Sequence, residues 1–138
     1  MKTDKMKVAA GTIIQYGDKV LMCKRAENKV YGGQWSIPIG HVENNESPIN
    51  AAKREFFEET NLKLTGDVKL IDIITKNNGT MIYVYYKNSG VELNPDLENA
   101  KDGQEHTECG YFSNSNLPFE NEDDDEIYKI ITRVLRRG

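Results

Sequence analysis

One segment near the middle of the chain has a helical hydrophobic period, and it constrains the fold more than any other feature of the sequence. Apolar residues recur there three and four positions apart, which predicts that one face of a helix packs on a core. These residues are Ile49, Ala52 and Phe56. Ser47 is suited to cap the first amides of this helix, and Pro48 is tolerated at its first position. We expect the helix to run to Thr60 and to end at Asn61 in the left-handed conformation.

Strand-like runs lie on both sides of this helix. They span residues 8–15, 20–25, 64–75, 80–86 and 107–112. Turn residues around Gly17 and Gly79 separate two pairs of these runs and predict hairpins. Residues 123–137 predict a closing helix, because acids lead it, arginines end it and apolar residues recur at helical spacing. Strands before and after a central helix predict a mixed α/β domain whose helices pack on a mixed sheet.

The length and charge of the chain narrow the classes of function. The chain has 138 residues, which suits a single domain over residues 1–138. Its formal net charge of −4 disfavours binding to nucleic acids or membrane surfaces, since both need a basic face. A small nucleotide stays compatible with this charge, because a bound cation can supply the missing positive charge.

The two cysteines, Cys23 and Cys109, do not form a C-x-x-C pair. We expect two reduced thiols in strands rather than a disulfide or a zinc site. No signal peptide is apparent in the first residues, and no apolar run has the length of a membrane span. These features predict a cytoplasmic protein without a membrane partner.

The central helix carries acidic residues whose spacing is typical of a cation site. Glu55 is followed three and four positions later by Glu58 and Glu59, so the three carboxylates are neighbours on the helix surface. They repel one another unless a cation lies between them, and Mg²⁺ prefers oxygen ligands of this kind. The alternative is a solvent-exposed helix face with weak ion pairs, such as Arg54 with Glu58. The carboxylates alone do not decide between these two interpretations.

A longer pattern of residues surrounds the carboxylates. It consists of Gly40, Glu46, Arg54, Glu55, Phe56, Glu58, Glu59 and Leu62. Its spacing resembles the signature of the Nudix hydrolase family (MutT-like), and the similarity extends over nearly the whole chain. Asn61 stands where the signature has glycine, and Ile39 stands where many members have glycine. Asparagine also tolerates a positive φ angle, and any residue at position 39 keeps its backbone carbonyl.

The resemblance implies a Nudix-type α/β/α sandwich, with a central mixed sheet and flanking helices. It also implies hydrolysis of a phosphoanhydride bond in a nucleoside diphosphate linked to another group, with Mg²⁺ or alternatively Mn²⁺ as the cofactor. We favour nucleoside triphosphates, cut to monophosphate and pyrophosphate. Nucleotide sugars, ADP-ribose, dinucleoside polyphosphates and RNA 5′ ends remain alternative substrates, and a non-catalytic nucleotide-binding module is an alternative function. Both a monomer and a homodimer are compatible with the sequence.

The resemblance also implies roles for individual residues. The metal ligands would be Glu55, Glu58, Glu59, Glu105 and the backbone carbonyl of Ile39. Arg54 would orient a carboxylate of the cluster, and Glu46 would support the cluster from outside. The general base would be Glu55 or Glu105, which the sequence does not rank; for Glu105, a solvated loop is an equally good interpretation.

Two further residues resemble substrate-binding positions of the family. Arg25 ends the second predicted strand, where relatives contact a phosphate, although a strand-end surface residue explains it as well. Asn121 precedes the last predicted helix, where some relatives that cleave triphosphates recognise the base. Ordinary helix-start chemistry explains Asn121 equally well.

Overall fold

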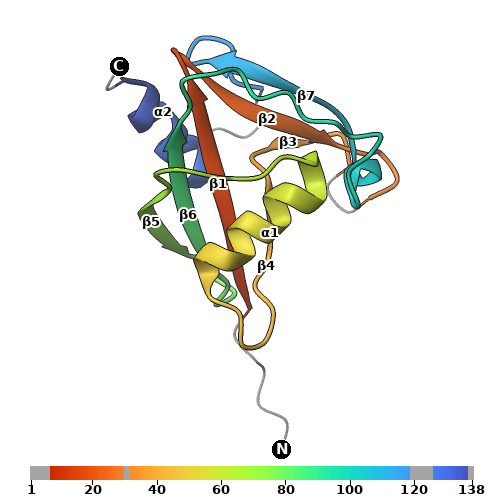
Figure 1. Cartoon of the computed structure of the whole chain (residues 1–138). Coiled ribbons are helices and arrows are strands. Elements are labelled where there is room, and N and C mark those ends of the chain that lie inside the picture. The colour runs from red at the N-terminus through yellow and green to blue at the C-terminus, as the bar shows by residue number, and fades with distance from the viewer. Residues whose placement is uncertain (1–6, 30–31, 119–125, 137–138) are drawn as a thin grey trace, which may run out of the picture.

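The computed structural model describes residues 7–29, 32–118 and 126–136, which form a sheet with helices on its two faces (Figure 1). The strands are β1 (Val8–Tyr16), β2 (Lys19–Arg25), β3 (Trp35–Ser36), β4 (Ile39–His41), β5 (Lys69–Thr75), β6 (Met81–Asn88) and β7 (His106–Ser113). The helices are α1 (Pro48–Thr60), the short 3-10 helix η1 (Gly103–Glu105) and α2 (Glu126–Arg136). Within the described residues, no helix is long and apolar enough to cross a membrane.

The sheet has the strand order β3-β2-β1-β6-β5, while β4 pairs with β1 and β7 pairs with β2. β1 and β6 are parallel, and the other paired strands are antiparallel. The sheet is therefore mixed, as predicted. The hairpins β1–β2 and β5–β6 also agree with the turns expected at Gly17 and Gly79, both of which adopt a positive φ angle.

Side chains of the central strand β1 alternate between two apolar cores. Ile13 packs with Ile131 of α2 on one face of the sheet. Ala10 and Ile14 lie on the other face, where they belong to the clusters beneath α1 that include Phe56. The chain thus forms an α/β/α sandwich, and α1 crosses the face opposite to α2 (Figure 1).

The ends of α1 follow the local signals in the sequence. The side chain of Ser47 accepts a hydrogen bond from the Asn50 amide at 3.3 Å, and Pro48 occupies the first turn. Asn61 adopts the left-handed conformation, with φ 62° and ψ 21°, and its amide donates to the Phe57 carbonyl at 2.8 Å. The predicted helix and both of its caps are therefore confirmed.

The strand expected over 64–75 begins later, at Lys69. Gly66 adopts φ +76°, which interrupts an extended backbone. Leu64 remains buried, but it packs beside Phe56 under α1 as part of a loop. Leu64 therefore packs against α1 instead of belonging to a strand, and the left-handed backbone at Gly66 separates it from β5. Residues 123–125 and 137 of the second predicted helix lie outside the described residues.

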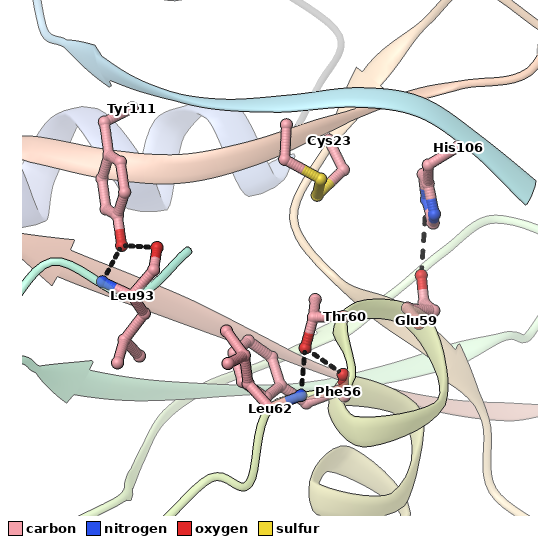
Figure 2. Close-up of a disulfide and its surroundings, with 9 residues drawn as sticks. Cys23, Phe56, Glu59, Thr60, Leu62, Leu93, His106 and Tyr111 are labelled. Carbon is pink, nitrogen blue, oxygen red and sulfur yellow. Dashed lines mark hydrogen bonds and ion pairs between the residues drawn. A yellow bond between two sulfur atoms is a disulfide. The ribbon is translucent and has the colours of Figure 1, made fainter. Parts of the chain in front are cut away.

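The expectation of two reduced thiols is wrong. Cys23 of β2 and Cys109 of β7 are directly opposite in the strand register, and they form a disulfide with a Cα–Cα distance of 4.0 Å (Figure 2). The two residues are 86 positions apart in sequence. Their spacing carries no information about the pairing of β2 with β7, and the geometry that joins them exists only in the folded sheet.

Candidate active site

Arg54 lies at the centre of a network that joins α1 to the loop before it. Its Nε and Nη2 atoms donate to the Glu46 carboxylate at 2.8 and 3.0 Å. Nη1 donates to Glu55 at 2.8 Å and to Glu58 at 3.3 Å, and Nη2 also donates to the backbone carbonyl of His41 at 2.9 Å. One guanidinium therefore fixes three carboxylates and the end of β4, as its planar set of donors allows.

The charges in this network reinforce one another. The hydrogen bond from Arg54 is the main reason that the pKa of Glu46 lies below its ordinary value. The pKa of Arg54 is raised, chiefly by the same bond to Glu46, so its positive charge persists at any pH the protein meets. Glu46 therefore holds Arg54, and Arg54 in turn holds the carboxylates of α1.

Gly40 allows Glu55 to approach the loop closely. A β-carbon at Gly40 would overlap the Glu55 carboxylate. The neighbouring residue, Ile39, points the other way and packs against the core that contains α2. Burial raises the pKa of Glu55, and the nearby charges of Glu58 and Asp102 add to this effect against the opposing influence of Arg54.

Glu59 is the most buried carboxylate of the cluster, with an exposed fraction of 3%. Its Oε1 atom lies 3.4 Å from Nε2 of His106, the first residue of β7 (Figure 2). Its Oε2 atom is buried and has no hydrogen-bond partner among the described residues. Burial raises the pKa of Glu59 well above the ordinary value, the charges of Glu55 and Glu105 raise it further, and Arg25 opposes the shift.

The segment between β6 and β7 is attached to the C-terminal end of α1. The amide of Asp102 donates to the Glu58 carbonyl at 2.7 Å, and the amide of Asp96 donates to the Thr60 carbonyl at 2.8 Å. Gly103 lets this segment fold tightly on itself beside α1, because a β-carbon there would overlap the backbone of Leu97 in the same segment. Carbonyls that lack partners within the helix thereby gain them from the loop.

This attachment brings two acidic residues to the carboxylate cluster. Glu105 was expected there, and its charge acts on Glu59. Asp102 was not singled out from the sequence, although its charge acts on Glu55. The available signal was the adjacent Gly103, since a glycine in a polar loop often marks a close backbone approach.

Arg25 also lies at this end of the sheet. It is the last residue of β2, pairs with His106 across a register shift, and its charge acts on both Glu59 and His106. Burial, followed by the charge of Arg25, lowers the pKa of His106 to about 4, so the imidazole is neutral at neutral pH. Asn121 lies outside the described residues.

The chain matches the model of the NUDIX domain over residues 5–134. It belongs to the Nudix hydrolase family. This Nudix domain is 35% identical over 65 residues to an 8-oxo-dGTP diphosphatase from Proteus vulgaris, which covers 47% of this chain and 58% of that protein. It is 36% identical over 47 residues to an RNA pyrophosphohydrolase from Bartonella henselae, which covers 34% of this chain and 27% of that protein. The matches thus span less than two thirds of either relative.

Solved structures agree on the fold of this Nudix domain. A MutT NUDIX hydrolase from Burkholderia pseudomallei superposes with a TM-score of 0.75 at 22% identity, over 94% of this chain and 98% of that one. At this level of identity the similarity concerns the fold. The expected Nudix-type sandwich is therefore confirmed.

The donor set of the Nudix helix fits a hard divalent cation. Among the described residues no three acidic, histidine or cysteine side chains are already arranged as a ligand set, and Arg54 is bonded to Glu55 and Glu58. The buried Oε2 atom of Glu59 nevertheless has no hydrogen-bond partner in the described part of the chain, and such an atom is costly unless a donor or a cation satisfies it. Carboxylate oxygens in this density are suitable ligands for Mg²⁺ or Mn²⁺.

Proposed function

We propose that this protein hydrolyses a phosphoanhydride bond of a small nucleotide with the help of Mg²⁺. The observation that carries the proposal is the buried, unpartnered oxygen of Glu59 beside Glu55 and Glu58 on the signature helix. A structural carboxylate has no reason to be buried without a donor for both oxygens, whereas a metal ligand does. Mn²⁺ is expected to replace Mg²⁺.

The proposed ligands are the cluster itself and the elements that face it. They are Glu55, Glu58, Glu59, Glu105 and the backbone carbonyl of Ile39. We add Asp102 to this proposed set, because its charge acts on Glu55. A bound divalent cation would neutralise the charge of the diphosphate and favour ionisation of the attacking water. The surrounding residues then bind and orient the nucleotide.

Protein groups would perform the remaining tasks. Arg54 keeps Glu55 and Glu58 in place through the bonds described above. The charge of Arg25 acts on Glu59, and we expect its guanidinium to bind a phosphate of the substrate. Glu55 and Glu105 are the two candidates for the base that takes a proton from water. The raised pKa of Glu55 brings that carboxyl closer to the pH at which a base works well.

We favour nucleoside triphosphates as substrates, with monophosphate and pyrophosphate as products. The similarity to a relative named 8-oxo-dGTP diphosphatase supports this choice over nucleotide sugars, ADP-ribose and dinucleoside polyphosphates. The relative named RNA pyrophosphohydrolase makes a triphosphorylated RNA 5′ end the main competitor, although the net charge of −4 is unfavourable for RNA.

A substrate panel tests this proposal. Nucleoside triphosphates, 8-oxo-dGTP, ADP-ribose, a nucleotide sugar, a dinucleoside tetraphosphate and a short 5′-triphosphorylated RNA would each be incubated with Mg²⁺ and, separately, with EDTA. We expect release of pyrophosphate from a nucleoside triphosphate with Mg²⁺ alone. Tight nucleotide binding by calorimetry without any product over hours would instead identify a non-catalytic binding module.

A further inference from the structure

The pair Glu59–His106 differs from the other carboxylate contacts at this site. Glu55, Glu58 and Glu46 are all held by Arg54 at the edge of the cluster, where solvent reaches them. Glu59 instead faces His106, and the side chains of both residues are nearly inaccessible, at 4% and 5% of their full exposure. The Glu59 carboxyl group and the His106 imidazole are therefore enclosed together between the last turn of α1 and the start of β7.

The backbone fixes the position of the His106 ring. The amide of Ala26 donates to the Glu105 carbonyl at 2.8 Å, directly before His106. The His106 amide donates to the Gly103 carbonyl, which closes the short helix η1. Because β2 and β7 pair from Lys19 to Arg25, the first residue of β7 has little freedom to move. The imidazole is thus held against Glu59 by the sheet rather than by the helix that carries Glu59.

The surroundings of the ring indicate where its proton lies. Whether an imidazole is neutral or charged, it can carry an N–H at a ring nitrogen that faces an acceptor. Nε2 lies 3.4 Å from Oε1 of Glu59, while Nδ1 is buried and has no hydrogen-bond partner among the described residues. With a cation bound, Glu59 would be ionised, and its carboxylate is the acceptor that these residues offer to the ring, so the proton would lie on Nε2.

We propose that His106 is a positioning residue, whose Nε2–H donates to Oε1 of Glu59 and thereby leaves Oε2 directed at the bound cation. This inference rests on the proposed metal-dependent function. A carboxylate with one oxygen hydrogen-bonded and the other free is oriented as a metal ligand without losing charge. The 3.4 Å separation exceeds the usual range of about 2.7–3.2 Å, and such bonds commonly shorten when the ligand binds.

Two amide variants and one apolar variant separate this role from simple packing. In His106→Gln the side-chain amide reaches the place of Nε2 and can still donate to Glu59. In His106→Asn the amide reaches only the place of Nδ1, and His106→Leu fills the space without a donor. The readout is the dissociation constant for Mn²⁺ alone, measured from the free-ion signal in electron paramagnetic resonance, with circular dichroism to confirm the fold.

We expect His106→Leu and His106→Asn to bind Mn²⁺ about 10–100-fold more weakly than the wild type, the usual effect of removing such a partner. His106→Gln should stay within about threefold of the wild type. In a Glu59→Gln background, His106→Leu should no longer change the affinity, because the interaction it removes is already absent. If His106→Leu does not fold, the Mn²⁺ affinities of His106→Gln and His106→Asn alone test whether a donor at the place of Nε2 is needed.

The Mn²⁺ measurements distinguish a failure of the proposed role of His106 from a failure of the proposed metal site. If the wild type binds Mn²⁺ and the Leu and Asn variants bind it equally well, His106 does not position Glu59 and the proposed metal site survives. A Gln variant as weak as the Asn variant would likewise refute the role of Nε2. If the wild type itself does not bind Mn²⁺, the proposed function fails together with this inference.

Discussion

The amide of Asp102 donates to the carbonyl of Glu58 at 2.7 Å, so the loop before β7 is attached to the last turn of α1. Together with the bond from the Asp96 amide to the Thr60 carbonyl, it brings acidic residues of the loop beside those of the signature helix, more than forty positions earlier in the chain. The cluster therefore depends on the packing of that loop as much as on the helix. Variants of the loop and of the helix should have separable effects on stability and on activity.

Gly103→Ala tests the compact fold that lets the loop before β7 attach to α1. The added β-carbon would overlap the Leu97 backbone, which cannot move aside as a side-chain tip can. We expect a loss of about 1–3 kcal/mol in the free energy of unfolding, measured with urea. The matched control is Gly90→Ala, since nothing lies within 4 Å of a β-carbon at Gly90. Equal stability of the two variants would contradict the close approach at Gly103.

Gly40→Ala should leave the free energy of unfolding nearly unchanged but should lower the activity. The three atoms nearest to its β-carbon all belong to the carboxylate tip of Glu55, which can rotate away at little cost to stability. The displaced Glu55 is then misplaced for metal binding and for chemistry, and we expect kcat/KM to fall by about 100-fold. If Gly40→Ala had both the melting temperature and the kcat/KM of the wild type, Glu55 would not need this position.

The ends of α1 could be predicted from the sequence, whereas one acidic residue of the site could not. Ser47, Pro48 and Asn61 act within a few positions of the helix they delimit, so α1 and both its caps were predictable. The carboxylate cluster followed from helical spacing and from the resemblance to the family signature. Asp102, by contrast, joins the site only because its loop packs on the end of α1.

Long-range pairing explains the other errors. Cys23 and Cys109 become neighbours through the pairing of β2 with β7, which no local pattern specifies. The contact of His106 with Glu59 arises in the same way, since β7 begins beside the helix end. This pairing is also what buries His106 beside the end of α1.

Removal of the disulfide should destabilise the protein markedly. The crosslink joins residues 86 positions apart, for which chain entropy predicts a contribution of about 4.6 kcal/mol. We expect the melting temperature of the wild type to fall on addition of a reductant, and that of the Cys23→Ser/Cys109→Ser variant to be low and insensitive to it. A wild-type melting temperature unchanged by reductant would contradict a disulfide in the folded protein.

The pH dependence of stability should reveal the cost of burying Glu59. Its pKa in the folded protein is raised above the ordinary value of 4.5, chiefly by burial. The folded state therefore retains the proton where the unfolded state has released it, and stability falls as pH rises from about 4.5 through the raised pKa. Glu59→Gln lacks this titration, so the variant should gain stability relative to the wild type over that interval.

The measurement for Glu59→Gln is a series of urea unfolding curves between pH 4 and 8 without metal. The advantage of the variant should grow with pH and then level off above the raised pKa. Addition of Mg²⁺ should stabilise the wild type and remove the advantage, because the ion binds only the folded state. A difference between the two proteins that does not vary with pH would argue against a raised pKa for Glu59.

The Mg²⁺ dependence of hydrolysis by Glu58→Gln tests the central claim most directly. Glu58 is bonded to Arg54 on the signature helix, whereas Glu98 is an exposed loop glutamate and provides the matched control Glu98→Gln. With the nucleoside triphosphate selected by the panel, we predict pyrophosphate release by the wild type and by Glu98→Gln with Mg²⁺. EDTA should abolish this release, and Glu58→Gln should be slower by about 100-fold or more while keeping the wild-type fold. Full activity of Glu58→Gln, or hydrolysis that persists in EDTA, would contradict a metal-dependent phosphoanhydride hydrolase built on α1.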